Sequence, residues 1–225
     1  MAKPKAKRAA GPREDALSRD RIVAAAIELL DSVGDDGLTF RALAAHLATG
    51  AGAIYWHIAN KHDLLAAASD AVVARVLASI TAHATPRRAI RNIAVGVFEA
   101  VDAHPWLGPQ LARGPWQTAT LQILERIGRQ VQALGAPDRA QFTAASALVS
   151  YILGVSDQNA ANGRLVAPAA DRDAVLAAEA ARWNALAPDA FPFLRKIAPQ
   201  LRMHDDRAEF LAGVDLILAG IAAAR

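Results

Sequence analysis

Apolar residues recur at intervals of three and four from Ser18 onward, a pattern that predicts amphipathic helices. Ser18 is suited to cap the first helix, which is expected to end at the glycines of SVGDDG, residues 32–37. Thr39 is suited to cap a short second helix, FRALAAHL, over residues 40–47. The glycine-containing stretch ATGAG, residues 48–52, is therefore expected to form a tight turn.

A third short helix, which contains AIYWHI (residues 53–58), is expected to end near Asn60, and a long fourth helix is expected to begin at Lys61. Two short helices joined by a tight turn form a helix-turn-helix unit, whose second short helix enters the major groove of DNA. Ile54 supplies the core contact of this helix, so we expect Tyr55 and His57 to face DNA and Trp56 to sit at the edge of the core. The alternative is an aromatic patch that closes a small core.

The rest of the chain keeps the helical spacing and shows no alternation typical of strands, so the fold is predicted to be all-α. The segment HPWLGPQLARGPW, residues 104–116, contains three prolines and is expected to form a pocket wall instead of a packed helix. One further helix is expected to start at Thr85-Pro86, and another to end at Gly135. Three more are expected over 137–162, 171–187 and 189–199, and the last helix is expected to begin at Asp205.

Composition restricts the chemistry available to this chain. Its 225 residues are 53% hydrophobic and include no cysteine, which excludes disulfides, thiolate catalysis and cysteine-based zinc sites. No apolar run reaches the roughly 18 residues of a membrane span, and the N-terminus lacks the apolar core of an export signal. A cytoplasmic protein without membrane contact is therefore expected.

Positive charge is concentrated at the N-terminus, although the formal net charge is only +3. Residues 1–17 are expected to form a disordered tail, because they hold few large apolar side chains that could offset the entropy of ordering. Two roles are open for this tail: a solvated end, or an arm that reaches DNA phosphates or the minor groove. Its basic residues are Lys3, Lys5, Lys7, Arg8 and Arg13.

The segment from Ser18 to about residue 65 resembles the DNA-binding domain of the tetracycline-repressor (TetR) family. The resemblance rests on the start SRDR, on GLTFRALA and on IYWHIANKHDLL, and it covers less than a quarter of the chain. It implies a helix-turn-helix domain over 18–65 and a helical ligand-binding and dimerisation domain over 66–225. Such a protein would be a homodimeric repressor that binds a palindromic operator in double-stranded DNA and is released by a small-molecule inducer.

The resemblance also implies roles for single residues. Arg41, on the second helix, would read a guanine or a phosphate. In this chain residues 50–53 are GAGA, which offer no side-chain donor to a base, so operator recognition is expected to rely on DNA shape and on Arg41. The other implied DNA contacts are Thr39, Tyr55 and Lys61 on the phosphate backbone, with Trp56 and His57 completing the surface.

The second domain would hold the inducer and the dimer interface. We expect a mainly apolar pocket and a flat hydrophobic or aromatic inducer, unless the aromatic residues are ordinary core. The interface is expected on the 138–162 helix and the last helix, with Ile217 inside it. The candidate ligand contacts are the aromatic residues Phe98, Trp106, Trp116 and Tyr151 and the polar residues His104 and Gln158.

Other clusters have simpler explanations than a catalytic or metal site. HDD at residues 204–206 is interpreted as a helix N-cap by Asp205, because consecutive residues point in different directions on a helix. Glu99 and Asp102 are interpreted as a solvated helix face. No enzyme activity, metal or cofactor is therefore expected. The alternatives to a ligand-gated repressor are a DNA-binding regulator controlled by a protein partner, and a helical enzyme or scaffold.

Overall fold

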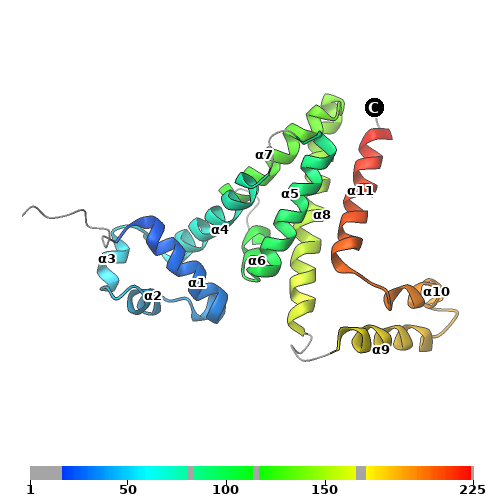
Figure 1. Cartoon of the computed structure of the whole chain (residues 1–225), viewed down its shortest axis with the longest axis horizontal. Helices are drawn as coiled ribbons and strands as arrows, with labels where there is room; N and C mark the ends of the chain where they lie inside the picture. Colours follow the sequence, from blue (N-terminus) through cyan, green and yellow to red (C-terminus); the bar gives the residue numbers. More distant parts are fainter. Residues whose placement is uncertain (1–16, 81–83, 114–116, 166–170, 224–225) are drawn as a thin grey trace, which may run out of the picture. The chain divides into compact units, whose positions relative to one another are not determined.

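The computed structural model describes residues 17–80, 84–113, 117–165 and 171–223 (Figure 1). Over this part of the chain there are eleven α-helices and no strand, so the predicted all-α fold is confirmed. The chain divides into two compact units, one ending at Ala68 and the other beginning at Ser69. Apart from Leu17, the expected basic tail lies outside the described residues.

The first unit contains three helices and the start of a fourth: α1 (Arg19–Gly37), α2 (Phe40–His46), α3 (Ala51–Tyr55) and α4 (Lys61–Ala78). Both predicted caps are confirmed. The Ser18 hydroxyl accepts a hydrogen bond from the Arg21 N–H at 3.2 Å, and the Thr39 hydroxyl accepts one from the Ala42 N–H at 3.0 Å. The buried core of this unit includes Ile22, Ala26, Leu30, Leu43, Ile54, Ile58 and Leu64.

The turn between α2 and α3 differs from the expectation. The left-handed position falls on Ala48, with a φ of +51°, and not on a glycine of ATGAG. The Thr49 N–H donates to the Ala44 carbonyl at 2.9 Å, which satisfies the end of α2. Gly50 then precedes α3 in extended conformation, and this helix ends at Tyr55, well before the expected end near Asn60.

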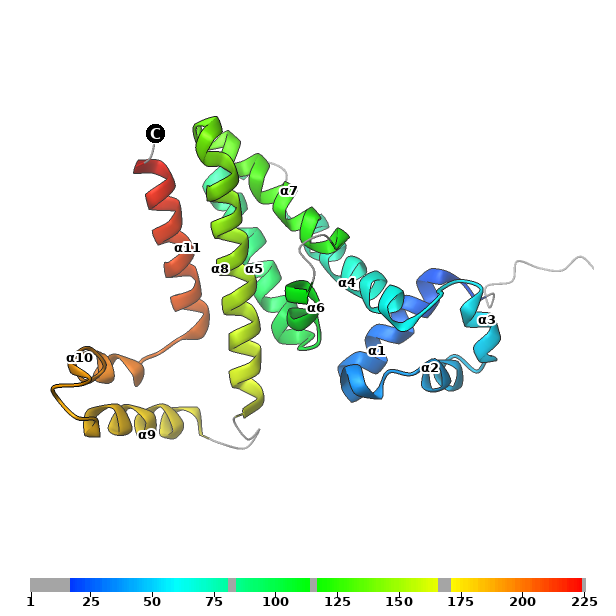
Figure 2. The same ribbon diagram turned by 180° about the vertical axis from the view of Figure 1, so that it is seen from behind.

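The second unit is a bundle in which α8 (Asp138–Leu165) packs against four other helices. Figures 1 and 2 show α8 beside α11 on one side and α5 and α7 on the other. The four helices around α8 are α5 (Pro86–Ala103), α6 (Leu107–Arg113), α7 (Thr118–Ala133) and α11 (Asp206–Ala223). Their buried side chains include Ile90, Ile93, Val97, Val101, Leu111, Ile123, Ile127, Leu148, Ile152, Val214 and Leu218.

The proline-rich segment forms helix α6, so the expectation of an unpacked pocket wall there is wrong. Leu107 and Leu111 are buried on its inner face, and Trp106 just before it is also buried. Pro109 lies in the first turn of α6, where a backbone N–H has no helical partner to lose. Prolines at the start of a helix therefore did not break it.

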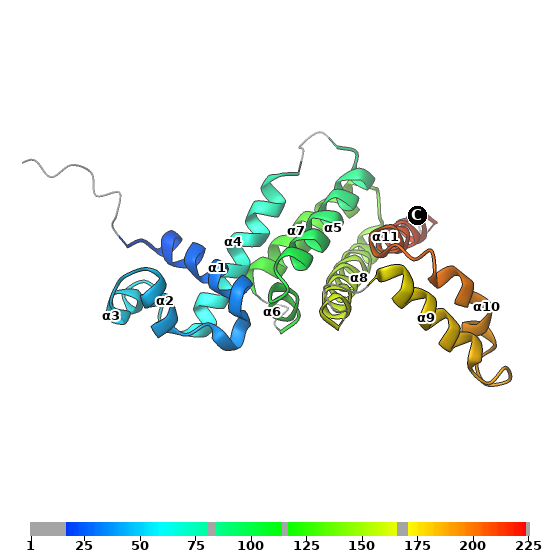
Figure 3. The same cartoon turned by 60° about the horizontal axis from the view of Figure 1, so that its bottom comes forward.

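Two further helices, α9 (Arg172–Ala185) and α10 (Pro192–Leu201), form a hairpin whose members lie side by side in Figure 3. They pack mainly against each other, and their fully buried residues are only Ala180 and Ala198. The Arg172 guanidinium connects the hairpin to the bundle through Asp206, at 2.6 Å. This ion pair is one contact that holds the hairpin to the rest of its unit.

Candidate nucleic-acid interface and ligand cleft

The helix-turn-helix unit presents an aromatic pair on its surface. The rings of Phe40 and Tyr55 stack face to face, with centroids 4.5 Å apart and planes only 5° from parallel. Tyr55 remains 54% exposed, so one face of its ring is supported by α2 while its hydroxyl is free to reach outward. The stack fixes the direction of Tyr55 before any partner binds.

Trp56 follows the last residue of α3 and is 89% exposed, so its expected position at the edge of the core is wrong. Ile54 and Ile58 on either side are both buried, and the Ile58 N–H donates to the Ile54 carbonyl at 3.0 Å. These two isoleucines fill the core beneath the chain, which leaves Trp56 and His57 on the outside. An apolar patch that closes the core is therefore excluded for Trp56.

The expected phosphate-binding residues differ in how they are held. The Lys61 ammonium forms an ion pair with Asp35, at 2.8 Å from Oδ1, and also donates to the Asp35 carbonyl. The Thr39 oxygen is occupied as the α2 cap, but its hydroxyl hydrogen can still be donated. Arg41 is exposed on α2. These groups place positive charge and donors on the same small unit as Tyr55.

The second unit contains a cleft with a volume of about 850 Å³, joined to a smaller pocket of about 320 Å³ through shared residues. We refer to both together as the cleft. It is lined from α5 by Phe98, Glu99 and Asp102, from α8 by Tyr151, Val155, Gln158, Asn159, Asn162 and Gly163, from α9 and α10 by Arg172, Val175, Leu176 and Leu201, and from residues 204–207, Glu209 and Phe210.

Three aromatic rings form a continuous stack at one wall of the cleft. Phe210 lies between the other two, with its ring centroid 4.7 Å from that of Phe98 and 5.8 Å from that of Tyr151. The Tyr151 hydroxyl donates to the Phe210 carbonyl at 3.2 Å, and a Cβ on Gly213 would lie 1.9 Å from that hydroxyl. Gly213 is therefore required for Tyr151 to lie against α11.

Ion pairs connect the walls of the cleft. The Asp206 carboxylate pairs with the Arg172 guanidinium at 2.6 Å and with the His204 ring at 2.9 Å. The Arg207 guanidinium pairs with the Glu99 carboxylate at 3.3 Å. The Asp205 carboxylate accepts a hydrogen bond from the Ala208 N–H at 2.7 Å, which confirms the predicted N-cap of α11. The residues of HDD therefore hold the start of α11 and its neighbours in place.

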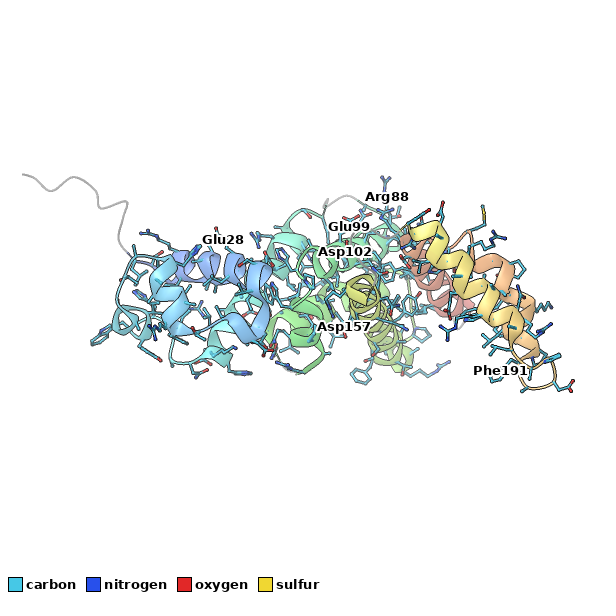
Figure 4. The ribbon with its side chains drawn as sticks, turned by 90° about the horizontal axis from the view of Figure 1, so that it is seen from below. Glu28, Arg88, Glu99, Asp102, Asp157 and Phe191 are labelled. Atoms are coloured by element: carbon cyan, nitrogen blue, oxygen red, sulfur yellow. The ribbon has the colours of Figure 1, made fainter. Side chains whose placement is uncertain are left out.

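Negative charge predominates near Tyr151. Burial raises the pKa of the Tyr151 phenol, and the nearby Glu209 carboxylate raises it further. Figure 4 shows Glu99 and Asp102 close together on α5. Because both line the cleft, the interpretation of these two residues as a merely solvated face is incomplete.

The structure brings together only part of the predicted ligand-binding set. Phe98, Tyr151 and Gln158 line the cleft. His104 and Trp106 do not; they form a pair with ring centroids 6.0 Å apart between α5 and α6. Trp116 lies outside the described residues. The lining also differs from the mainly apolar pocket that we expected, because it includes several charged and amide side chains.

The polar lining residues had a weak signal in the sequence. Glu99 and Asp102 on α5, and Asn159 and Asn162 on α8, are each spaced three apart, which gives a helix one polar stripe. Arg172 and Arg207 gave no local signal, since their partners lie on other helices. Within the described residues no group of His, Asp and Glu could hold a metal ion, and no described helix is long and apolar enough to cross a membrane.

Comparison with known proteins agrees with this architecture. Residues 22–68 match the family model of bacterial regulatory proteins, tetR family, and residues 83–225 match that of the tetracyclin repressor-like C-terminal domain. The chain is similar to the transcriptional regulator SCO7222, a TetR from Streptomyces coelicolor. The two structures align with a TM-score of 0.84 and 54% identity, over 93% of this chain and 99% of that one.

Sequence relatives give shorter matches. An HTH-type transcriptional regulator of Saccharopolyspora erythraea is 35% identical over 141 residues, which make up 61% of this chain and 59% of the relative. The class C tetracycline repressor protein of Escherichia coli is 42% identical over 71 residues, 32% of this chain and 31% of that protein. The chain thus matches less than two thirds of the length of either relative.

Proposed function

Since the chain belongs to the TetR family of bacterial transcriptional regulators, we propose that it is a ligand-responsive repressor. In this proposal a homodimer binds a palindromic operator and leaves it when a small molecule occupies each cleft. The protein acts by binding and not by catalysis. One relative carries the name of a repressor, the class C tetracycline repressor protein, which supports repression as the direction of control.

The observation that carries the proposal is the exposed aromatic surface at the end of α3. Trp56 and Tyr55 project from a small, otherwise well-packed unit, and exposed large apolar side chains of this kind mark binding surfaces. Tyr55, Thr39 and Lys61 are proposed to contact phosphates. Arg41 is proposed to read a guanine or a phosphate, with Trp56 and His57 beside it.

The start of α3 contributes shape instead of donors. A Cβ at Gly50 or Gly52 would meet nothing within 4 Å, so packing inside the protein does not require a glycine at either position. Small residues there allow the backbone of α3 to approach DNA closely, in the manner of glycines at other close contacts. This supports recognition by groove shape together with Arg41.

The exposed faces of α8 and α11 support a homodimer. Leu216 on α11 is 75% exposed, so the outer face of this helix carries a large apolar side chain. The outer face of α8 carries small exposed residues that permit close approach of a second helix: Thr143, Ala147, Ser150 and Gly154. Ile217 is half-buried within the protomer, so Leu216 is the better candidate for the interface.

Coupling between ligand and DNA is proposed to run through α4. This helix starts with the phosphate-contacting candidate Lys61 in the first unit and continues to Ala78 in the second. In the second unit the Arg126 guanidinium donates to the Leu77 carbonyl at 3.2 Å, which ties the end of α4 to α7. A ligand that binds one conformation of the second unit better than the other would shift α4 and weaken DNA binding.

A gel-shift assay with the purified full-length protein tests the proposal. The probe is the DNA upstream of the protein's own coding region, and the competitor is a random duplex of equal length. Binding of the upstream probe at a competitor excess that removes non-specific complexes is the expected result. Arg41→Ala should lower the discrimination by about 1–3 kcal/mol if Arg41 reads a base. Equal retention of both duplexes would refute sequence-specific repression.

A further inference from the structure

The cleft carries an excess of negative charge. Five carboxylate side chains line it, against two arginines: Glu99, Asp102, Asp205, Asp206 and Glu209, with Arg172 and Arg207. The whole chain has a formal net charge of +3, so the cleft differs in sign from the molecule around it. A local excess of one sign in a concave site attracts ligands of the opposite charge.

The paired and unpaired carboxylates can be separated. Both arginines already have a carboxylate partner, Arg172 in Asp206 and Arg207 in Glu99, and Asp205 caps α11. Within the described part of the chain, the side chains of Asp102 and Glu209 form neither an ion pair nor a hydrogen bond. These two carboxylates therefore remain available to a ligand.

The amide groups in the cleft are also available. The side chains of Asn159 and Asn162 line both parts of the cleft, and no described residue satisfies them by a hydrogen bond. Each amide oxygen can accept a hydrogen bond from an ammonium group. They extend the acceptor surface of the two carboxylates along α8.

Partly exposed apolar side chains supply the apolar half of the site. Tyr151 and Leu176 are half-buried and Val175 is 39% exposed, whereas Phe98 and Phe210 are almost completely buried at 6% and 1% exposure. A flat apolar group can lie against the exposed parts of these side chains, and a cation near the ring of Tyr151 gains additional attraction. The size of the larger part, about 850 Å³, lies within the range of sites for drug-sized molecules.

From this juxtaposition of unpaired carboxylates, free amides and partly exposed apolar side chains we infer that the cleft binds an organic cation with a flat apolar part, such as an aromatic amine in its protonated form. This inference rests on the proposed ligand-responsive function and specifies the class of its ligand. It adds a positive charge to the flat hydrophobic or aromatic inducer expected from the sequence, because Asp102 and Glu209 are exposed in the cleft and have no counter-charge of their own.

Two dyes of similar size test the charge preference: rhodamine 6G, a planar aromatic cation, and fluorescein, a planar aromatic anion. Each is titrated with the full-length protein in the absence of DNA, and fluorescence anisotropy measures the dissociation constant. Rhodamine 6G is expected to bind at least about tenfold more tightly than fluorescein. The positive net charge of the chain works against this preference, so it must come from a local site.

The decisive variant is Asp102→Asn combined with Glu209→Gln, which removes two charges while keeping the shape of both side chains. Its preference for rhodamine 6G should fall to about one tenth of that of the original protein. The matched control is Asp173→Asn combined with Asp189→Asn, which removes two exposed carboxylates that do not line the cleft. This control should keep the full preference.

Three results would overturn the inference: no binding of rhodamine 6G, equal affinity for both dyes, or a preference that survives in the decisive variant. Circular dichroism confirms that each variant is folded. Because no DNA is present, these titrations are independent of operator binding. A protein that selects the cationic dye but fails the gel-shift test would refute repression and leave the ligand class standing.

Discussion

The Lys61 ammonium lies 2.8 Å from Asp35 Oδ1 and also donates to the Asp35 backbone carbonyl. Asp35 lies just after Gly34, where a φ of +70° bends the end of α1 toward the start of α4. Asn60 accepts from the Asp63 N–H at 2.9 Å and so fixes the first turn of α4. A lysine that we propose as a phosphate contact is thus held in place, and partly neutralised, by a carboxylate of another helix.

Substitutions of Lys61 and of Asp35 should change DNA affinity in opposite directions. Lys61→Ala is expected to weaken binding to all DNA sequences equally. It should also reduce the slope of log affinity against log salt concentration by about one unit. Asp35→Asn should strengthen binding to all sequences several-fold, because the full lysine charge then faces the phosphates. Fluorescence titrations at several salt concentrations measure both effects.

The double variant decides whether Asp35 acts through Lys61. If it does, Asp35→Asn has no effect on DNA affinity once Lys61 is alanine, which is the result we expect. An equal gain in both backgrounds would mean that Asp35 repels phosphates directly. Loss of folding would show as a lowered thermal midpoint and is checked for each variant.

Gly52→Ala should separate stability from DNA binding. The added methyl group meets nothing within 4 Å, and alanine favours a helix over glycine by about 1 kcal/mol, so the free energy of unfolding should rise. Affinity for operator DNA should fall, because the methyl group stands where we propose that the α3 backbone approaches the groove. Urea titration and gel shift measure the two effects. Unchanged DNA affinity would place the close approach elsewhere.

Leu216→Arg should convert the proposed dimer into a monomer, because it introduces an unpaired charge into an apolar interface. Light scattering gives the mass in solution. Met203→Arg is the matched control, since Met203 is even more exposed but lies between α10 and α11, outside both helices of the proposed interface. A Leu216→Arg protein that remains a folded dimer would exclude this face as the interface.

Asp215 should contribute to stability in a pH-dependent way. A hydrogen bond from Arg91 lowers the pKa of Asp215 below its ordinary value, with a further contribution from Arg87 at 3.1 Å. A lowered pKa means that the stabilisation is present above pH about 4 and is lost as the pH falls through the folded-state pKa. The carboxylate is more than a third exposed, so its contribution is at most about 1 kcal/mol.

Urea unfolding at fixed protein concentration compares Asp215→Asn with the original chain at pH 7, 5 and 3. The difference in the free energy of unfolding should be present at pH 7 and 5 and should shrink toward zero at pH 3. A difference that is the same at all three pH values would show that packing of the side chain, and not its charge, stabilises the contact between α5 and α11.

Features encoded within a few residues could be predicted from the sequence. Ser18, Thr39 and Asp205 each cap a helix through a bond to a residue three positions later, so the local pattern suffices. The buried face of α1 follows from spacing alone. The position of Trp56 was predicted wrongly because it depends on where α3 ends. The end of α3 depends on how Ile58 packs in the core, which local spacing does not reveal.

The cleft could not be predicted in the same way. Glu99 and Arg207 meet across 108 positions of the chain, and Arg172 and Asp206 across 34. Such pairs depend on how α5, α9 and α11 pack, so neither residue carries a local sign of its partner. The aromatic residues Phe98 and Tyr151 were identified because size alone made them candidates, whereas Phe210, which joins them, was not among the candidate ligand contacts.

The sparse packing of α9 and α10 has a kinetic consequence. With two buried alanines and a polar link through Arg172, this hairpin should open at a far lower free energy than the bundle around α8. Amide hydrogens of the hairpin should therefore exchange with deuterated water sooner than those of α8, which mass spectrometry of peptide fragments would record. Since the hairpin forms one wall of the cleft, a bound molecule could enter and depart through this fluctuation. Its residence time would then be set by the hairpin, and equal protection of both regions would argue against such a route.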